Sequence, residues 1–215
     1  MKVSPSIISA KLDHLATEIL QCESAGVDSY HLDVMDGHFV PNLTMGPDLV
    51  KAVRRNTKKK LEAHLMIDRP DKYYGPFLDA GADTLLVHAE CLVDFKKLHT
   101  DITSAGGDFG IVVNPETPLE HAIPYLEDAR ILLIMSVHPG FSGQKFIPAT
   151  IDKIRRAKNY ITEKKLKVEI EVDGGINDET GSLCAEAGAD ILVSASYIFS
   201  GNIAERIGIL KEMGR

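Results

Sequence analysis

A four-residue phrase, Ala-Gly-x-Asp, recurs along this chain and constrains its fold more than any other feature. It occupies residues 25–28, 80–83, 105–108 (with Gly107 at the variable position) and 187–190. At each occurrence a helical pattern ends and an apolar strand pattern begins, and glycine is the residue expected just past a helix C-terminus. The four glycines that follow alanine are separated by 55, 25 and 82 residues, or two, one and three steps of about 27 residues, and eight such steps fill the 215 residues.

Eight short apolar segments follow this schedule and are predicted strands: residues 3–8, 29–34, 61–66, 84–88, 109–113, 131–137, 168–172 and 191–194. Amphipathic helical patterns lie between them, as at residues 12–24 and 150–165. Strands that alternate with helices indicate parallel βαβ units, and eight units predict an α/β protein with a single (β/α)8 TIM barrel over residues 1–215. A doubly wound open sheet is the alternative, but no G-x-G-x-x-G motif follows the first strand to support a dinucleotide site.

Composition excludes several classes of partner. The formal net charge of −7 and pI near 5.6 argue against nucleic acid, and no apolar stretch approaches the roughly 18 residues of a membrane helix. The N-terminal residues lack the apolar core of a signal peptide, so we expect a cytoplasmic protein. The cysteines have no metal-binding or redox spacing and are expected to be buried thiols: Cys22, Cys91 and Cys184.

In a barrel, catalytic groups lie at the carboxyl ends of the strands. Polar residues stand at or just past all eight predicted strand ends: Ser6, Asp33, His64, His88, Asn114, His138, Asp173 and Ser196. The second strand is notable because His31 and Asp33, two residues apart, share one face of a buried segment. A buried carboxylate is costly unless it is compensated, so this pair indicates a site, although a hydrogen-bonded core pair is the simpler alternative.

His31, Asp33, His64 and Asp173 have the side-chain types of a divalent metal site that suits zinc, manganese, iron or cobalt. Three of eight steps around the ring separate the second strand from the seventh, so Asp33 and Asp173 should face each other across the mouth. Two carboxylates so placed could remove a proton from one face of a substrate and return one to the other, through a metal-stabilised enediolate. The alternative for residues 173–175, Asp-Gly-Gly, is an ordinary turn.

Glycine pairs follow the sixth and seventh predicted strands and could present backbone N–H groups to an anion. The first pair, Gly140 and Gly143, encloses Phe141 and Ser142; the second is Gly174 and Gly175, and Ala195 with Ser196 follows the eighth strand. These loops are where barrels frequently bind phosphate, although tight turns would use the same residues. Methionines near strand ends could form an apolar floor or simply pack in the barrel: Met35, Met66 and Met135.

Seven segments together closely resemble the ribulose-phosphate 3-epimerase family, in family order over nearly the whole chain. They are residues 4–10, 31–42, 64–66, 87–90, 114–118, 139–146 and 172–176, of which HLDVMDGHFVPN at 31–42 is the most specific. The resemblance implies a barrel of the ribulose-phosphate-binding type that interconverts D-ribulose 5-phosphate and D-xylulose 5-phosphate by inverting C3. It also implies a ketose phosphate as the small-molecule partner and a homo-oligomer.

Residue by residue, the resemblance makes His31, Asp33, His64 and Asp173 the ligands of one divalent ion per subunit, with zinc favoured. Asp33 and Asp173 match the acid/base pair. The substrate-contacting set is then Ser6, His64, Met35, Met66, Met135, Gly140, Phe141, Ser142, Gly143, Gly174, Gly175, Ala195 and Ser196. The chain departs from the family pattern at four positions, none of them a catalytic candidate: Lys11, His138, Ser142 and Ala195.

Three alternative functions stay open on the sequence. The same chemistry could act on D-allulose 6-phosphate. Related phosphosugar barrels that decarboxylate or cleave carbon–carbon bonds carry Asp-x-Lys-x-x-Asp, whereas Met35 stands two residues after Asp33 here. A non-catalytic phosphosugar-binding barrel is the third.

Overall fold

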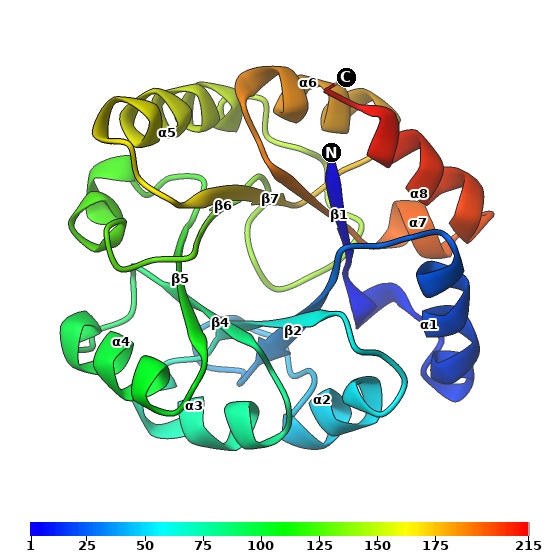
Figure 1. Ribbon diagram of the computed structural model, residues 1–215, viewed down its shortest axis with the longest axis horizontal. Coiled ribbons are helices and arrows are strands. Elements are labelled where there is room, and N and C mark those ends of the chain that lie inside the picture. The colour runs from blue at the N-terminus through cyan, green and yellow to red at the C-terminus, as the bar shows by residue number, and fades with distance from the viewer. Residues whose placement is uncertain (215) are drawn as a thin grey trace.

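In the computed structural model, which describes residues 1–214, eight parallel strands form one sheet that curls into a nearly closed barrel inside a ring of helices (Figure 1). The strands are β1 Lys2–Pro5, β2 Ser29–Met35, β3 Lys60–Met66, β4 Thr84–His88, β5 Asp108–Val113, β6 Ile131–Met135, β7 Glu169–Asp173 and β8 Ile191–Ser194. Their order is β1-β8-β7-β6-β5-β4-β3-β2, and a parallel bridge between Ser6 and His31 joins the two ends. The predicted TIM barrel is confirmed.

The helices are α1 Leu15–Ser24, α2 Pro47–Arg54, α3 Pro70–Asp79, α4 Phe95–Ser104, α5 Thr150–Lys164, α6 Asp178–Ala187, α7 Ser196–Phe199 and α8 Ile203–Glu212. The expected alternation fails once, because β5 is followed by two 3-10 turns, Leu119–His121 and Ile123–Tyr125, in place of an α-helix. Prolines at 115, 118 and 124 explain the difference, since proline lacks the N–H that a continuous helix needs.

Two strand ends were predicted too late. The first strand stops at Pro5 rather than at residue 8, because the Ser6 hydroxyl accepts a hydrogen bond from the Ile8 N–H and starts a 3-10 turn. The sixth stops at Met135 rather than at residue 137. The three cysteines are buried, as expected. No helix within residues 1–214 combines the length and apolarity needed to cross a membrane.

The glycine and the aspartate of the Ala-Gly-x-Asp phrase each have a structural role. Gly26, Gly81, Gly106 and Gly188 all adopt a positive φ, which ends the preceding helix in the left-handed conformation that glycine favours. Three of the aspartates then accept the N–H of a residue at or near the start of the neighbouring strand, at 2.9 Å in each case: Asp28 from Val3, Asp83 from Leu61 and Asp190 from Ile170. The phrase therefore ends a helix and fixes strand register.

The inside of the barrel has an apolar side and a polar side. Leu86, Val112, Leu133 and Met135, from β4 to β6, pack with Ile131, Val137 and Ile191 as one buried cluster. Opposite them lie polar side chains that are at most 5% exposed: Ser4, Ser6, Ser29, His31, Asp33, Glu62, His64 and Glu171. Strand residues between these point outward and pack against the helices, as Leu32 and Val172 do. The polar side is built mainly from β1, β2, β3 and β7, with His88 at the end of β4 next to His64.

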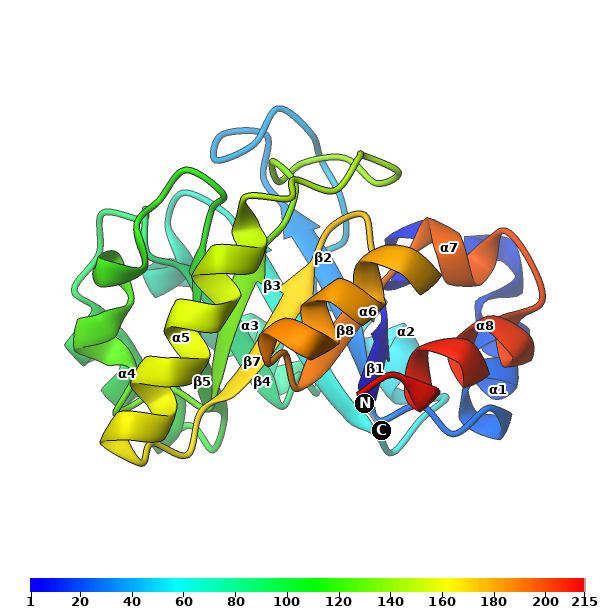
Figure 2. The same cartoon turned by 90° about the horizontal axis from the view of Figure 1, so that it is seen from above.

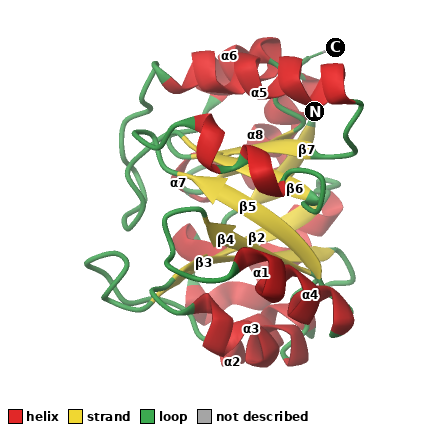
Figure 3. Ribbon diagram, turned by 90° about the vertical axis from the view of Figure 1, so that its left-hand side faces the viewer, coloured by secondary structure: helices red, strands yellow, loops and turns green. Residues whose placement is uncertain are grey.

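Long loops gather on the side of the barrel opposite the N-terminus. Figure 2 shows the loop after β2 and the loop after β6 rising together on that side, and Figure 3 shows the same concentration of loops at one edge of the strands. Asn42 Nδ2 in the first loop donates to the Gly140 carbonyl in the second, at 2.7 Å. The two loops therefore meet above the carboxyl ends of the strands.

Candidate active site and metal centre

Four side chains from three strands converge inside the barrel at this end. His31 and Asp33 come from β2, His64 from β3 and Asp173 from the end of β7. His31 Nε2 lies 3.5 Å from Asp33 Oδ1 and 3.8 Å from Asp173 Oδ2. His64 Nδ1 lies 3.2 Å from Asp33 Oδ1, 3.9 Å from Asp173 Oδ2 and 3.1 Å from His31 Nε2. One donor atom from each residue lies within 4.8 Å of all the others.

This donor set fits a divalent ion. Metal–ligand bonds of about 2.0–2.2 Å in a tetrahedron place donor atoms roughly 3.3–3.6 Å apart. The separations found here, 3.1–3.9 Å, span that range. Two neutral imidazoles and two carboxylates also carry together the charge that balances a divalent cation. The four residues that the sequence singled out could therefore hold a metal ion.

The two carboxylates differ in their electrostatic environment. Burial disfavours the charged form of Asp33, but the charge of His31 and hydrogen bonds with His31 and His64 hold its pKa well below the usual range. The Ser6 hydroxyl also donates to Asp33 Oδ2. Burial and repulsion from Asp33, by contrast, raise the pKa of Asp173 to about 7. Neighbouring carboxylates with separated pKa values are the usual arrangement of a catalytic acid and base.

The two imidazoles are separated in the same way. Burial alone would lower the pKa of His31, but Asp33 and Glu171 outweigh it and raise that pKa well above its ordinary value. Burial is the main cause that lowers the pKa of His64 to about 3, with a contribution from the charges of His88 and His31. Without a metal ion His64 is therefore neutral, whereas His31 must lose a proton before it can bind one.

Two buried glutamates complete the polar side of the barrel, and sequence reasoning missed both. Glu171 Oε1 lies 2.9 Å from His31 Nδ1, so that Nε2 of the same ring faces the cluster. The Ser4 hydroxyl donates to Glu62 at 2.8 Å, and burial together with repulsion from Glu171 raises the pKa of Glu62 to about 8. Strand alternation could have found them, because each stands two residues before a predicted ligand and shares its face.

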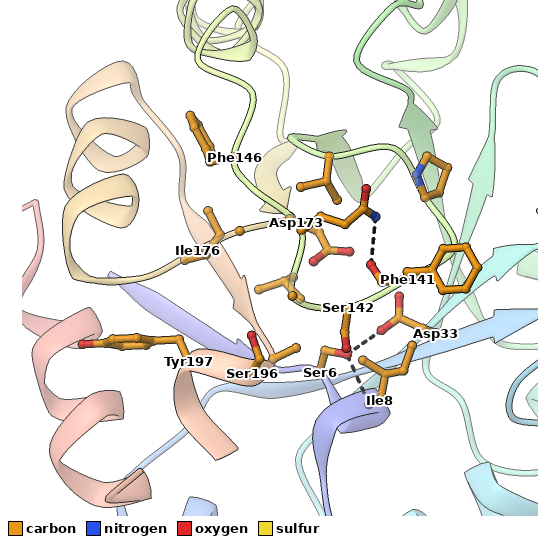
Figure 4. Close-up of a pocket in the computed structure, with 18 of the residues that line it drawn as sticks. Ser6, Ile8, Asp33, Phe141, Ser142, Phe146, Asp173, Ile176, Ser196 and Tyr197 are labelled. Carbon is orange, nitrogen blue, oxygen red and sulfur yellow. Dashed lines mark hydrogen bonds between the residues drawn. The ribbon is translucent and has the colours of Figure 1, made fainter. Parts of the chain in front are cut away.

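A cavity of about 460 Å³ opens above the cluster (Figure 4). Most of the predicted substrate contacts line it: Ser6, Met35, Met66, Met135, Gly140, Phe141, Ser142, Gly143, Gly174, Gly175, Ala195 and Ser196. The carboxylates of Asp33 and Asp173 enter it from different strands, with Ser6 bonded to Asp33. His31 and His64 are fully buried and lie beneath the cavity, not on its wall. Residues that line it without having been predicted include Lys145, Asn177, Tyr197 and Arg206.

Two of the loop glycines are required by close packing. A Cβ at Gly174, where φ is 123°, would lie 2.7 Å from the Val137 nitrogen, and one at Gly175, where φ is 65°, would lie 2.7 Å from the Phe146 nitrogen. Ala195 keeps a negative φ of −108°, the condition under which alanine can present its N–H to an anion. His138 does not line the cavity; it is exposed, with its Nε2 3.3 Å from Glu116 Oε1.

Fold and site together define a (β/α)8-barrel enzyme with a candidate metal centre at the carboxyl ends of its strands. The sequence model described as the ribulose-phosphate 3 epimerase family matches residues 2–199. A curated protein named ribulose-phosphate 3-epimerase from Bacillus subtilis is 46% identical over 200 residues, or 93% of this chain and 92% of the relative. One from Methanocaldococcus jannaschii is 45% identical, covering 93% and 84% of the two chains. The chain belongs to the ribulose-phosphate 3-epimerase family.

Solved structures with much lower identity share the fold. The 3-hexulose-6-phosphate synthase from Salmonella typhimurium superposes with a TM-score of 0.72 at 19% identity and covers 100% of this chain and 98% of its own. A tryptophan synthase alpha-subunit variant from Pyrococcus furiosus gives 0.73 at 16% identity, covering 99% and 98%. These likenesses show the barrel architecture alone.

Proposed function

We propose that this protein is a metal-dependent epimerase that interconverts D-ribulose 5-phosphate and D-xylulose 5-phosphate by inverting C3. The observation that carries the proposal is the convergence of Asp33 and Asp173, from β2 and β7, on one candidate metal centre below the cavity. Inversion needs a base on one face of the reacting carbon and an acid on the other, and two carboxylates from different strands can supply both. Membership of the family supports the choice of substrate.

The environments of the two carboxylates assign their starting roles. Asp33 is held ionised by Ser6 and the two histidines, so it begins as the base that takes the C3 proton. Burial and repulsion from Asp33 raise the pKa of Asp173 to about 7, so a protonated form is available near neutral pH and can deliver a proton to the opposite face. In the reverse reaction the roles exchange. A divalent ion, when bound by the four residues, supplies positive charge that stabilises negative charge developing on the substrate oxygens.

Zinc is the ion we favour, because two imidazoles and two carboxylates at these separations suit tetrahedral coordination. Iron, manganese and cobalt accept the same side chains, so loading metal-depleted protein with each ion in turn, and measuring turnover, identifies the ion that works best.

The loop end of the cavity suits a phosphate group. Gly174, Gly175, Ala195 and Ser196 line it, and Gly140 to Gly143 close it from the loop after β6. Turns of this kind present backbone N–H groups to anions. The methionines at the strand ends, Met35, Met66 and Met135, add apolar surface to the same cavity. A volume of about 460 Å³ falls within the usual range for small-molecule sites.

An NMR assay in deuterium oxide tests the proposal. Metal-depleted protein is mixed with D-ribulose 5-phosphate, with and without added zinc or manganese. We expect xylulose 5-phosphate labelled with deuterium at C3 only when metal is present. Absence of both exchange and inversion at C3 would contradict the epimerase assignment, and ligand binding without exchange would favour a non-catalytic phosphosugar-binding protein.

The same assay with D-allulose 6-phosphate decides between the two epimerase substrates. We expect a higher kcat/KM for the five-carbon phosphate, and a higher value for the six-carbon substrate would replace the pentulose assignment.

We also propose a cytoplasmic homo-oligomer, for which light scattering after size-exclusion chromatography measures the mass in solution.

A further inference from the structure

Three side chains in contact, His64, His88 and Glu90, lead away from the candidate metal centre, and we call them the relay. His64 Nε2 lies 2.8 Å from His88 Nε2, and the two rings are nearly parallel, with centroids 4.9 Å apart. His88 Nδ1 in turn lies 3.3 Å from Glu90 Oε2. His88 is completely buried, and the Phe39 ring packs on it with centroids 4.6 Å apart. Neither His88 nor Glu90 lines the cavity.

Glu90, at the far end of the relay, is held by two hydrogen bonds from the loop after β5. Glu90 Oε1 accepts hydrogen bonds from the Asn114 N–H, at 2.9 Å, and from the Thr117 hydroxyl. Burial works against ionisation of Glu90, but His88, Thr117 and Asn114 lower its pKa to about 2. Glu90 is therefore an ionised acceptor that is held in one orientation.

When an ion occupies the metal centre, one arrangement of protons gives each contact between His64, His88 and Glu90 a donor and an acceptor. His64 Nδ1 faces the candidate metal centre, and binding an ion there needs its lone pair, so the proton of His64 stands on Nε2. That N–H donates to His88 Nε2, which leaves the proton of His88 on Nδ1. His88 Nδ1–H then donates to Glu90. Reversing any one bond places two donors or two acceptors against each other.

We propose that His88 and Glu90 are positioning residues that fix the tautomer of His64 and thereby set the affinity of the metal centre; the inference rests on the metal-dependent function proposed above. His31 has the direct form of the same device, since its second nitrogen meets the Glu171 carboxylate. On the His64 side a whole imidazole is inserted between ligand and carboxylate. Partners of this kind orient the ligand ring and raise its basicity.

Glu90→Gln tests the relay with almost no change in shape. If the glutamine carbonyl keeps the bonds from Asn114 and Thr117, its amide N–H2 faces His88 Nδ1 and reverses the direction of donation. His88 then carries its proton on Nε2, and His64 must move its proton to Nδ1, the nitrogen that faces the metal centre. We expect the zinc affinity of Glu90→Gln to fall by about 10- to 100-fold, the usual effect of losing such a partner.

The readouts do not depend on turnover. Zinc affinity is measured by competition with a chromophoric chelator, and NMR of zinc-loaded protein with ¹⁵N-labelled histidine identifies the protonated nitrogen of each ring. In the unaltered protein we expect the proton of His88 on Nδ1, and in Glu90→Gln on Nε2. Glu116→Gln is the matched control, because it removes one exposed carboxylate next to Thr117, outside the contacts between Glu90 and His64, and should leave zinc affinity unchanged.

A second pair of variants keeps the test informative if Glu90→Gln folds poorly. His88→Gln offers a side-chain carbonyl to the His64 N–H, whereas His88→Leu offers none, so the glutamine variant should retain more zinc affinity. Zinc affinity within twofold of the unaltered protein in both His88→Leu and Glu90→Gln would overturn the relay, as would a proton on His88 Nε2 in the unaltered protein. Failure of the unaltered protein to bind any divalent ion would instead contradict the metal-dependent function itself.

Discussion

Replacing Asp173 by asparagine should separate proton exchange at C3 from inversion of C3. Asparagine keeps the shape and an oxygen that can face the metal centre, but it can neither donate nor accept the transferred proton. Asp33 stays intact, still bonded to Ser6 and in contact with His64 at 3.2 Å. One carboxylate can therefore still remove and return a proton on its own face of the substrate.

The size of the effect follows from the role of the lost group. A positioned acid or base contributes about 10²- to 10⁴-fold to rate, or about 2.7–5.4 kcal/mol of barrier. We expect interconversion by Asp173→Asn to fall by that factor, while one of the two epimers still exchanges its C3 proton with solvent. Asp33→Asn should show the converse, with exchange confined to the other epimer.

Deuterium incorporation at C3, followed by NMR from each pure epimer, measures both quantities in one experiment. Metal content is determined for each variant, so that loss of the ion is not mistaken for loss of the proton carrier. Interconversion by Asp173→Asn within tenfold of the unaltered rate would refute the acid/base assignment. Exchange of the same epimer by both variants would refute the idea that the carboxylates serve opposite faces.

Three further outcomes follow from the structure. Prolonged treatment with a chelator should abolish turnover and lower Tm, and zinc restored at 100 times its Kd should return about 2.7 kcal/mol of stability, as judged by urea unfolding with and without metal. Gly174→Ala should destabilise the protein by more than the roughly 1–2 kcal/mol that a positive φ alone costs, because its Cβ would lie 2.6 Å from the Val137 side chain. Gly143→Ala, with φ 76° and open space around it, should cost only the free energy of the positive φ, and paired urea titrations compare the two variants. Burial raises the pKa of each cysteine thiol to about 12, so an aromatic disulfide reagent at neutral pH should label these thiols only as fast as the protein opens, and rapid labelling of the folded protein would contradict this for Cys22, Cys91 and Cys184.

The sequence was sufficient for the barrel because its signals are local and repeated. The glycine of Ala-Gly-x-Asp must adopt a positive φ wherever a helix ends, and this spacing alone indicated eight units. The missing helix after β5 was also visible in principle, since three prolines interrupt that segment. The strand ends at residues 8 and 137 were wrong because a 3-10 turn at Ser6 and a loop after Met135 override an apolar pattern.

The candidate site was only partly accessible from the sequence. His31 and Asp33 were found because they share a face, and His64 and Asp173 because they lie near or at strand ends. Glu171 was missed because its contact with His31 joins two strands that are far apart in the sequence. Glu90 was missed because its contact with His88 matters only through the contact between His88 and His64 on the neighbouring strand. Arg206 was missed because it approaches the cavity from α8, far along the chain from any strand end.

The bridge between Ser6 and His31 makes the site part of the seam of the barrel. β1 and β2 end the strand order, and around their junction the Ser6 hydroxyl reaches Asp33 while the Ser4 hydroxyl reaches across to Glu62 on β3. The side chains that close the cylinder are thus the metal-ligand candidates and their neighbours. An ion bound between β2, β3 and β7 would link strands on the two sides of this seam, so that part of its binding free energy would stabilise the closed barrel.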